Sequence, residues 1–392
     1  MAKVVMTVQG PISPDKLGFT LCHMHLCTNL ADWCLTPSRS SWYGIRSEKV
    51  SMANLGKIRM DPSICVDNLT IDDAEMCLEE LVDFHGLGGD TIVDTVPMTK
   101  PQMPTRDPIH QLEMSRKSGV NVVIASGWYI RDSFPAYVNT MPIDDMRDII
   151  ITELTEGCRY DWSPHGYPGF PMDAMGIKAG IIKTGAGMPP LDHYGPFANE
   201  NERKAWVAAC KAQAKTGRLI SLHPNAHEQI RFNPALVTFE PDAKPEDSVL
   251  HKYIDMLEEE GGDPKKFMIH HACQWISSPD VLRSVMDRGC YLSFDAFNEG
   301  QNYLLFAGAG VGPQNRLRCE TIKKFCDEGY VKHLLPSNEC GMKMHYKRYG
   351  GQGYTALQEY WIPIMKEGYG VKQEDIDTMF CENPKELLSY EE

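Results

Sequence analysis

Short runs of β-branched and other apolar residues recur along this chain, with longer amphipathic segments between them. Eight runs are typical of buried strands: residues 18–25, 90–96, 121–128, 179–185, 218–224, 266–272, 290–297 and 333–339. The helical patterns between them each carry a glycine near their end, a helix-stop signal, and include residues 70–89, 201–217, 248–262 and 315–330. Strands that alternate with helices predict a parallel sheet, and eight such units predict a (β/α)8 TIM barrel.

The chain has 392 residues, whereas such a barrel typically needs about 250. Three long segments hold the surplus: residues 26–70, 129–175 and 297–315. Each follows a predicted strand, so we expect long loops at the C-terminal face of the strands, where barrel enzymes build their active sites. A doubly wound, two-domain arrangement is the alternative. Because no Pro/Ser-rich linker divides the chain, we interpret residues 1–392 as a single domain.

Charge and composition exclude several classes of partner. The net charge of −14 argues against a nucleic-acid or anionic-membrane surface, because both need a basic patch. No apolar run reaches the roughly 18–20 residues of a membrane span, and the first residues lack a secretory apolar stretch. The 13 cysteines include no CxxC pair and lie mostly in apolar surroundings, which suits a reducing compartment. We therefore expect a cytoplasmic protein acting on a small molecule.

Histidines gather at the ends of the predicted strands. His23 and His25 are two residues apart in the first strand, where alternate side chains share a face. His223 closes the fifth strand, and His270 and His271 close the sixth. Because the strand ends of a barrel converge on one mouth, these imidazoles are predicted to meet. Alone, a His-x-His pair is a weak signal for metal; several histidines at one mouth favour a borderline metal such as zinc.

Two charged residues join this set. Glu339 closes the eighth strand, and Lys183 lies within the apolar fourth strand. A buried lysine carries a high desolvation cost unless it is paired or neutral. A neutral amine reacts with carbon dioxide to give a carbamate, an anion able to bridge two cations. The alternative is an ordinary ion pair, for example with Asp295.

Six segments of the chain resemble motifs of the phosphotriesterase family of the amidohydrolase superfamily. They are MTVQGPISPDKLGFTLCHMHL, AGIIKTGAG, NERKAWVAACKAQAKTGRLISLH, MIHHACQ, HLLPSNECG and FCENPKELL. The resemblance extends from about residue 4 to about residue 388. In combination these motifs are specific.

The resemblance implies a site with two divalent metal ions, zinc being the expected metal and manganese or iron the alternatives. Its six ligands would be His23, His25, Lys183, His223, His271 and Glu339. The His-x-His pair and Glu339 would hold the buried metal, and the other two histidines the exposed one. Lys183, carboxylated by carbon dioxide, and a hydroxide would bridge the ions, with the hydroxide as nucleophile. The family also suggests a homodimer.

The chain departs from the family pattern at several positions. Met24 replaces a glutamate and is predicted to point outward against the helices. Glu339 replaces an aspartate, so it either binds the buried metal or acts mainly as a proton shuttle; a structural ion pair is the alternative. The acid and histidine of the phosphotriesterase proton relay are replaced by Gln274 and Ala296. Asp295 is kept, and we expect it beside the metal ligands.

Three neighbouring residues carry weaker predictions. Trp128 and Tyr129, at the end of the third strand, either line the substrate pocket or simply cover the barrel. His270, next to the predicted ligand His271, is expected to face the opposite side as a packed or surface residue.

The sequence thus predicts a metal-dependent hydrolase that cleaves a carboxylic ester, lactone or amide. The replaced relay argues against phosphotriester hydrolysis, which stays as the alternative together with a metal-dependent lyase that uses Glu339 as its base. A binding protein on a decayed enzyme scaffold is a more distant alternative, because the four histidines and Lys183 are all present.

Overall fold

The computed structural model describes residues 2–37, 39–99, 106–160, 162, 175–187, 196–225, 232–233, 238–239, 244–297 and 315–391. Within this part, eight strands form one parallel sheet in the order β14-β13-β12-β9-β8-β7-β6-β3. Their bounds are β3 Phe19–Met24, β6 Gly89–Asp94, β7 Asn121–Ser126, β8 Ile181–Gly185, β9 Ile220–His223, β12 Phe267–Ile269, β13 Tyr291–Phe294 and β14 Leu334–Pro336. Each lies within or overlaps its predicted run, which confirms the (β/α)8 barrel.

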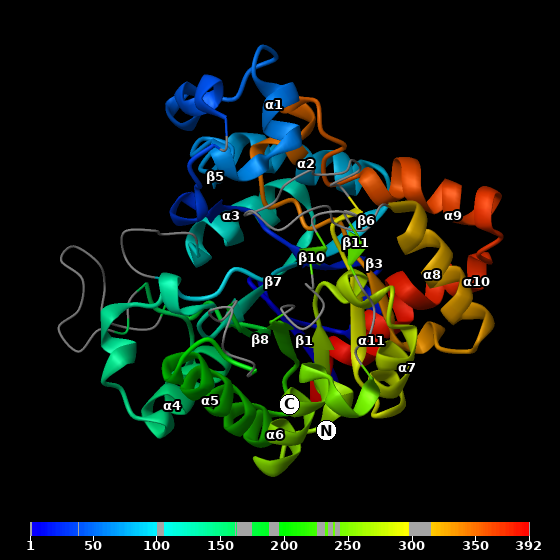
Figure 1. Cartoon of the computed structure of the whole chain (residues 1–392). Helices are drawn as coiled ribbons and strands as arrows, with labels where there is room; N and C mark the ends of the chain where they lie inside the picture. The colour runs from blue at the N-terminus through cyan, green and yellow to red at the C-terminus, as the bar shows by residue number, and fades with distance from the viewer. Residues whose placement is uncertain are drawn as a thin grey trace.

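Helices follow the strands around the outside of the barrel (Figure 1). They are α2 Ala74–Gly86, α3 Pro108–Ser118, α4 Ile143–Thr155, α5 Glu200–Thr216, α6 Val249–Glu259, α7 Pro279–Asp287 and α8 Asn315–Asp327, with α9 Ile362–Tyr369, α10 Gln373–Asp377 and α11 Asn383–Leu388 near the C-terminus. The predicted glycine stop signal is present at the end of α5, and a side chain caps the start of that helix. Asn199 caps α5 by accepting a hydrogen bond from the Glu202 amide, and Gly217 ends that helix with φ 63°.

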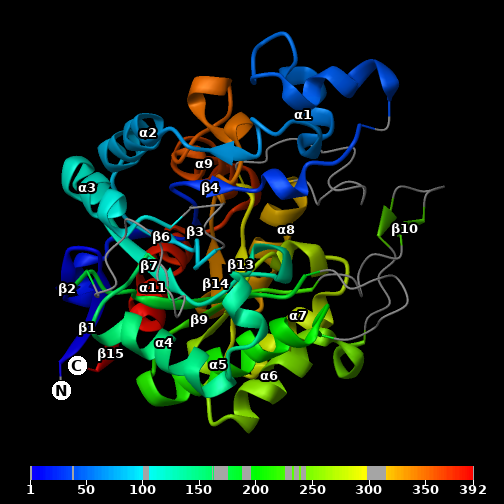
Figure 2. The same cartoon turned by 90° about the vertical axis from the view of Figure 1, so that its left-hand side faces the viewer.

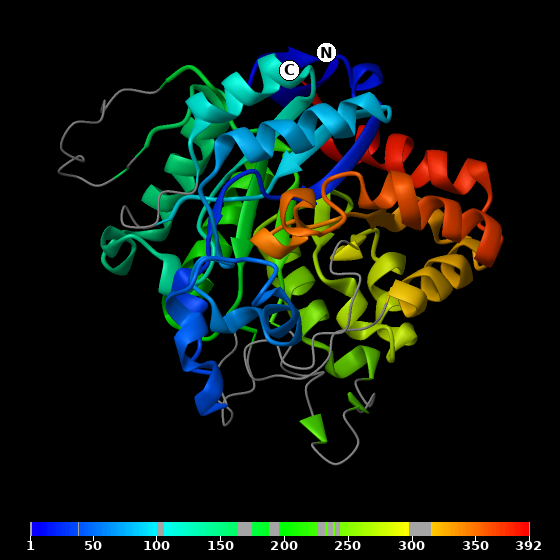
Figure 3. The same ribbon diagram turned by 90° about the horizontal axis from the view of Figure 1, so that it is seen from above.

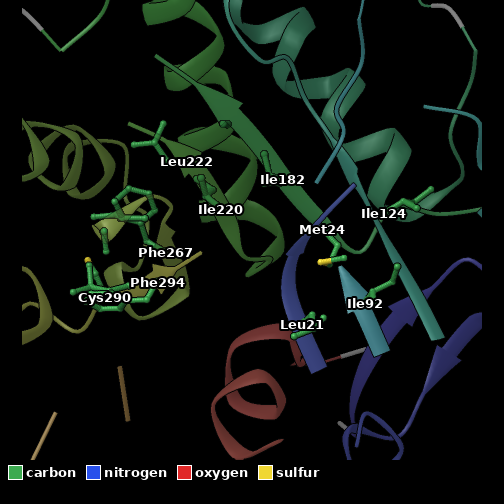
Figure 4. Close-up of a cluster of buried hydrophobic side chains, with 14 of the residues drawn as sticks. Leu21, Met24, Ile92, Ile124, Ile182, Ile220, Leu222, Phe267, Cys290 and Phe294 are labelled. Atoms are coloured by element: carbon green, nitrogen blue, oxygen red, sulfur yellow. The ribbon is translucent and has the colours of Figure 1, made fainter. Parts of the chain in front are cut away.

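The strands alternate between two apolar layers. Their outward side chains pack against the helices in one apolar cluster, and Figure 4 shows part of it, including Leu21, Met24 and Ile92. Their inward side chains, such as Val93, Ile181 and Met268, form a second cluster inside the barrel. Met24 is fully buried in the outer layer, which confirms its predicted outward direction.

The two ends of the sheet order, β3 and β14, lie next to each other and nearly close the barrel. The Ser337 hydroxyl accepts a hydrogen bond from the His23 amide (3.0 Å) and donates to the His23 carbonyl (2.7 Å). The Glu339 amide donates to the same carbonyl (3.1 Å). Two predicted metal-binding residues therefore lie at the seam of the barrel.

The long segment after β3 is folded. It contains β4 Thr28–Asn29, α1 Leu55–Met60 and β5 Thr70–Ile71. Its apolar residues, among them Ile45 and Ile58, form a separate cluster together with Met342 and Met344. Figures 2 and 3 show this segment at the end of the molecule opposite to both termini, which lie together because β1 Lys3–Thr7 pairs with β15 Tyr390–Glu391. The predicted loop at 129–175 is described over residues 129–160, 162 and 175, and it contains the helix α4. Of the predicted loop at 297–315, residues 298–314 lie outside the described residues.

Among the described residues, no helix combines the length and the apolar character needed to cross a membrane.

Candidate metal centre

An irregularity in β3 directs His23 into the barrel. The pairing of β3 with β6 changes register between Leu21 and Met24, so these two residues both face the helices although they are three apart. A bulge of this kind re-aims the side chains around it. The rings of His23 and His25 lie edge to face with their centroids 5.2 Å apart. The predicted pairing of these two histidines is thus present.

Asp295 connects the first and sixth strands of the barrel. Its fully buried carboxylate lies 2.7 Å from His23 Nδ1 and 2.9 Å from His271 Nδ1, and it accepts a hydrogen bond from the His271 amide (2.9 Å). Burial alone would raise the pKa of Asp295, but the two neighbouring histidines and these hydrogen bonds hold it well below its ordinary value. An ionised Asp295 thus fixes the orientation of both imidazoles, as predicted for a group beside the ligands.

Three residues just beyond neighbouring strands have left-handed backbone conformations. They are His271 (φ 56°), Ala296 (φ 63°) and Glu339 (φ 51°). Such φ values cost roughly 1–3 kcal/mol in residues other than glycine and concentrate at functional sites. At this mouth they turn Glu339 toward the histidines: its carboxylate oxygens lie 3.6 Å from His23 Nε2 and 3.4 Å from His271 Nδ1.

His270 does not face away from the site, and that prediction is wrong. It is fully buried, its ring centroid is 3.8 Å from that of His23, and its Nε2 contacts the Ser221 hydroxyl. Its Nδ1 lies 3.5 Å from Asp295. Because β12 ends at Ile269, inward-facing Met268 is followed by His270 on the same face, and the positive φ of His271 then brings that side chain inward as well.

His223 and Tyr129 meet on the other side of the mouth. His223 Nδ1 lies 2.8 Å from His271 Nε2 and 3.1 Å from the Tyr129 hydroxyl. Trp33, from the folded segment after β3, stacks on Tyr129 with centroids 6.2 Å apart. Trp128 instead lies in the outer apolar layer and donates its indole N–H to Tyr137 (3.4 Å). Of the two aromatic residues predicted to line the pocket, Tyr129 therefore contacts the candidate ligand His223, whereas Trp128 packs in the outer apolar layer.

Lys183 lies inside the barrel on β8, and its Nζ is buried with no hydrogen-bond partner among the described residues. Burial lowers its pKa to about 7, opposed by the negative charges of Glu339 and Asp295. The predicted alternative, an ion pair with Asp295, is not among the salt bridges that the described residues form. A large part of this amine is thus neutral near neutral pH, the form that reacts with carbon dioxide.

Three of the candidate histidines are in the protonation state that metals require. Burial lowers the pKa of His23 and of His223 well below their ordinary value. Burial, with the positive charges of Lys183 and His271 nearby, lowers the pKa of His25 to about 3. At neutral pH these three imidazoles are neutral and keep a lone pair for a cation.

The donor set fits divalent metal ions. Ligand atoms of His23, His271, Asp295 and Glu339 all lie within 4.8 Å of one another. His25 Nδ1 is buried without a partner among the described residues, as is the Lys183 amine. His25 and His223 adjoin this group through His23 and His271. Buried polar atoms rarely stay unpaired, so these two atoms mark a place where the surrounding residues could hold a metal ion.

Comparison with known proteins agrees with this geometry. The model of the phosphotriesterase family matches residues 3–388. The chain belongs to the phosphotriesterase family. The chain is therefore a metal-dependent hydrolase.

Relatives within the family match over nearly their whole length. An N-acetyltaurine hydrolase from Dictyostelium discoideum is 27% identical over 406 residues, covering 98% of this chain and 97% of that protein. A phosphotriesterase-related protein from Nematostella vectensis is 27% identical over 392 residues, covering 99% of both. The crystal structure of a resiniferatoxin-binding protein from Rhodobacter sphaeroides superimposes with a TM-score of 0.83 at 25% identity, covering 98% of this chain and 94% of that one.

Proposed function

We propose that this phosphotriesterase-family protein hydrolyses a carboxylic amide, ester or lactone at the mouth of the barrel, using two divalent metal ions, zinc most readily. The observation that carries the proposal is the buried Lys183 amine, which has no hydrogen-bond partner among the described residues. It lies inside the barrel near the neutral imidazoles of His23 and His223. Its reaction with carbon dioxide, with loss of a proton from nitrogen, would give a carbamate, an anion able to bind divalent cations. The metal ligands would be His23, His25, Lys183, His223, His271 and Glu339. When bound, the ions supply a hydroxide near neutral pH and polarise the oxygen of the scissile bond.

The surrounding residues orient the ligands and move the proton. The Asp295 carboxylate accepts hydrogen bonds from the Nδ1 atoms of His23 and His271, which leaves their Nε2 lone pairs for coordination. Glu339 is the only carboxylate of this group whose side chain reaches solvent, being 18% exposed, whereas Asp295 is fully buried. We assign to Glu339 the acceptance of the water proton and its transfer to the leaving group.

Two features favour a carbonyl over a phosphoryl substrate. Ala296 and Gln274 stand where the phosphotriesterase relay has a histidine and an acid. Ala296 is buried, and its side chain cannot carry a proton. The similarity to N-acetyltaurine hydrolases over the whole chain puts an N-acyl amide first among carbonyl substrates.

The aromatic pair of Trp33 and Tyr129 gives the pocket one flat wall beside His223. We propose that this wall receives the acyl or leaving group of the substrate, with Trp128 holding Tyr129 from the apolar layer.

A substrate panel tests the proposal. Protein expressed with zinc and bicarbonate would be assayed against N-acetyltaurine, other N-acyl amines, lactones, aryl esters and a phosphotriester. We expect turnover of one carbonyl class to exceed that of the phosphotriester, and we expect Lys183→Ala to abolish it. A faster phosphotriester reaction, or full turnover by Lys183→Ala, would overturn the assignment.

Oxygen-18 water separates hydrolysis from elimination. Hydrolysis places one solvent oxygen in the acid product, whereas a lyase that uses Glu339 as its base places none. Absence of label from the product would favour the lyase.

A further inference from the structure

His25 is held differently from the other histidines of the metal centre. Asp295 fixes the rings of His23 and His271 through their Nδ1 atoms. Neither ring nitrogen of His25, by contrast, makes a hydrogen bond to the described residues, and the buried Nδ1 is open to a cation. His25 also lies one residue beyond the end of β3, so the strand ladder does not hold its carbonyl. The direction of this ring therefore depends on whatever fixes the backbone of His25.

Two buried tyrosines from a distant segment bind that backbone. The Tyr354 hydroxyl donates to the His25 carbonyl (2.9 Å), and the Tyr346 hydroxyl lies 3.3 Å from the same oxygen. The two hydroxyls are 3.2 Å apart, and both side chains are fully buried. The Tyr346 hydroxyl is also 3.4 Å from the Cys340 carbonyl, one residue after Glu339. The pair thus joins the His-x-His strand to the chain just after Glu339.

A carboxylate on α2 fixes the segment that carries the tyrosines. Buried Glu80 accepts hydrogen bonds from the amides of Lys347 (2.7 Å) and Tyr354 (2.9 Å). Gly353, with φ 69°, passes so close that a Cβ there would lie 2.1 Å from a Glu80 oxygen. The positive φ and this close approach both require glycine. Helix α2, the tyrosine pair and His25 therefore form one continuous chain of contacts.

We infer that Tyr354, assisted by Tyr346, is a positioning residue for the metal ligand His25. The hydroxyl pair replaces, through the backbone, the ring hydrogen bond that metal-binding histidines usually make. The inference rests on the proposed metal centre. It assigns to the segment after β14 a part in holding the buried metal, although neither tyrosine is placed among the ligands.

Zinc binding to the full-length protein tests this inference. Metal-free protein would be titrated with zinc chloride against a chromogenic chelator, with bicarbonate present, for the parent, Tyr354→Phe and Tyr330→Phe. Tyr330 is the matched control, because its hydroxyl also donates a single hydrogen bond, to Asp287 (3.0 Å), at an exposed position. Melting temperatures of the metal-free and zinc-loaded forms would be recorded in parallel.

We expect Tyr354→Phe to weaken the binding of one zinc ion about 10- to 100-fold, the usual effect of losing a group that orients a ligand. Tyr354→Phe should then lower the melting temperature of the zinc-loaded form more than that of the metal-free form, because zinc that binds more weakly stabilises the folded state less. Tyr330→Phe should bind zinc as the parent does.

Parent affinity in Tyr354→Phe, with equal losses of melting temperature in both forms, would overturn the inference while leaving the metal centre intact. A parent that binds no zinc would overturn the proposed function and this inference together. If Tyr354→Phe does not fold, Tyr346→Phe is measured in the same way; a weakened zinc site supports the pair's role, and an unchanged one contradicts it.

Discussion

The Ser337 hydroxyl binds both backbone groups of His23, accepting from its amide and donating to its carbonyl. This contact joins β14 to β3, where no ladder pairing is formed between these two strands among the described residues. Ser337 is two residues before Glu339 in the chain. The closure of the barrel and the placement of His23, a predicted metal ligand, thus depend on the same side chain.

Ser337→Ala is expected to destabilise the protein by about 1–3 kcal/mol, because it leaves the buried His23 amide without its partner. Urea unfolding of the metal-free protein measures this. Ser47→Ala is the control, since its exposed hydroxyl donates only to the Gly44 carbonyl (3.4 Å) among the described residues. Equal, small losses in both variants would contradict the role of Ser337 in closing the barrel.

Asp295→Asn should weaken metal binding about 10- to 100-fold. The amide keeps the shape of the carboxylate, but its nitrogen cannot accept the hydrogen bonds that His23 and His271 make. Zinc titration of the metal-free protein measures the change, with Asp287→Asn as the control, because that carboxylate binds only a surface tyrosine in the described structure. Unchanged zinc affinity in Asp295→Asn would show that Asp295 does not orient the ligands.

Ala296→Gly should raise the free energy of unfolding by up to about 1 kcal/mol. Glycine removes the cost of the left-handed φ of 63°, and the greater flexibility of the unfolded chain offsets part of the gain. Ala209→Gly, in the middle of α5, should instead lower it by about 1 kcal/mol. Both values come from urea unfolding. If Ala296→Gly lowers the free energy of unfolding as much as Ala209→Gly does, the left-handed conformation of Ala296 does not strain the backbone.

Asp94, at the end of β6, should make stability depend on pH. Burial raises the pKa of its carboxyl from 3.8 to about 7, although Gln111 donates to it (2.6 Å). Because Asp94 has a higher pKa in the folded than in the unfolded state, its contribution to the free energy of unfolding is complete below about pH 4. That contribution is lost as the pH rises to about 7. One pKa unit is about 1.4 kcal/mol, so the loss is on the order of 4 kcal/mol.

Asp94→Asn tests this dependence, because the amide stays neutral and a rotated Gln111 amide can present its unpaired oxygen to it. Urea unfolding at pH 5 and pH 8 should show a smaller difference between the two pH values in the variant than in the parent. The same difference in both proteins would rule out Asp94 as its source.

The sequence predicted the barrel well because its pattern is local. Each strand is short, apolar and followed by a helix with its own stop signal. Met24 faces the helices as predicted, although a register shift in β3 puts Leu21 on the same face three residues earlier. Alternation also failed where a strand ended. The prediction for His270 assumed that β12 continues to His271, whereas it ends at Ile269 and a left-handed residue follows.

The supporting contacts could not be predicted, since they join segments far apart in the chain. Ser337 meets His23 across 314 positions, and Tyr354 meets His25 across 329. A serine two residues before Glu339 was the one available signal for the first contact, because strand alternation places both side chains inside the barrel. For the tyrosines the residue types carried no such signal.

Elemental analysis of the parent and of Lys183→Ala, each expressed with zinc and bicarbonate, tests whether the barrel holds a metal centre that depends on Lys183. We predict close to two zinc ions per chain in the parent and a large loss of zinc in the variant, because the Lys183 amine, unpaired among the described residues, would supply the proposed carbamate. A parent without zinc, or a variant that retains the parent's zinc content, would contradict this prediction.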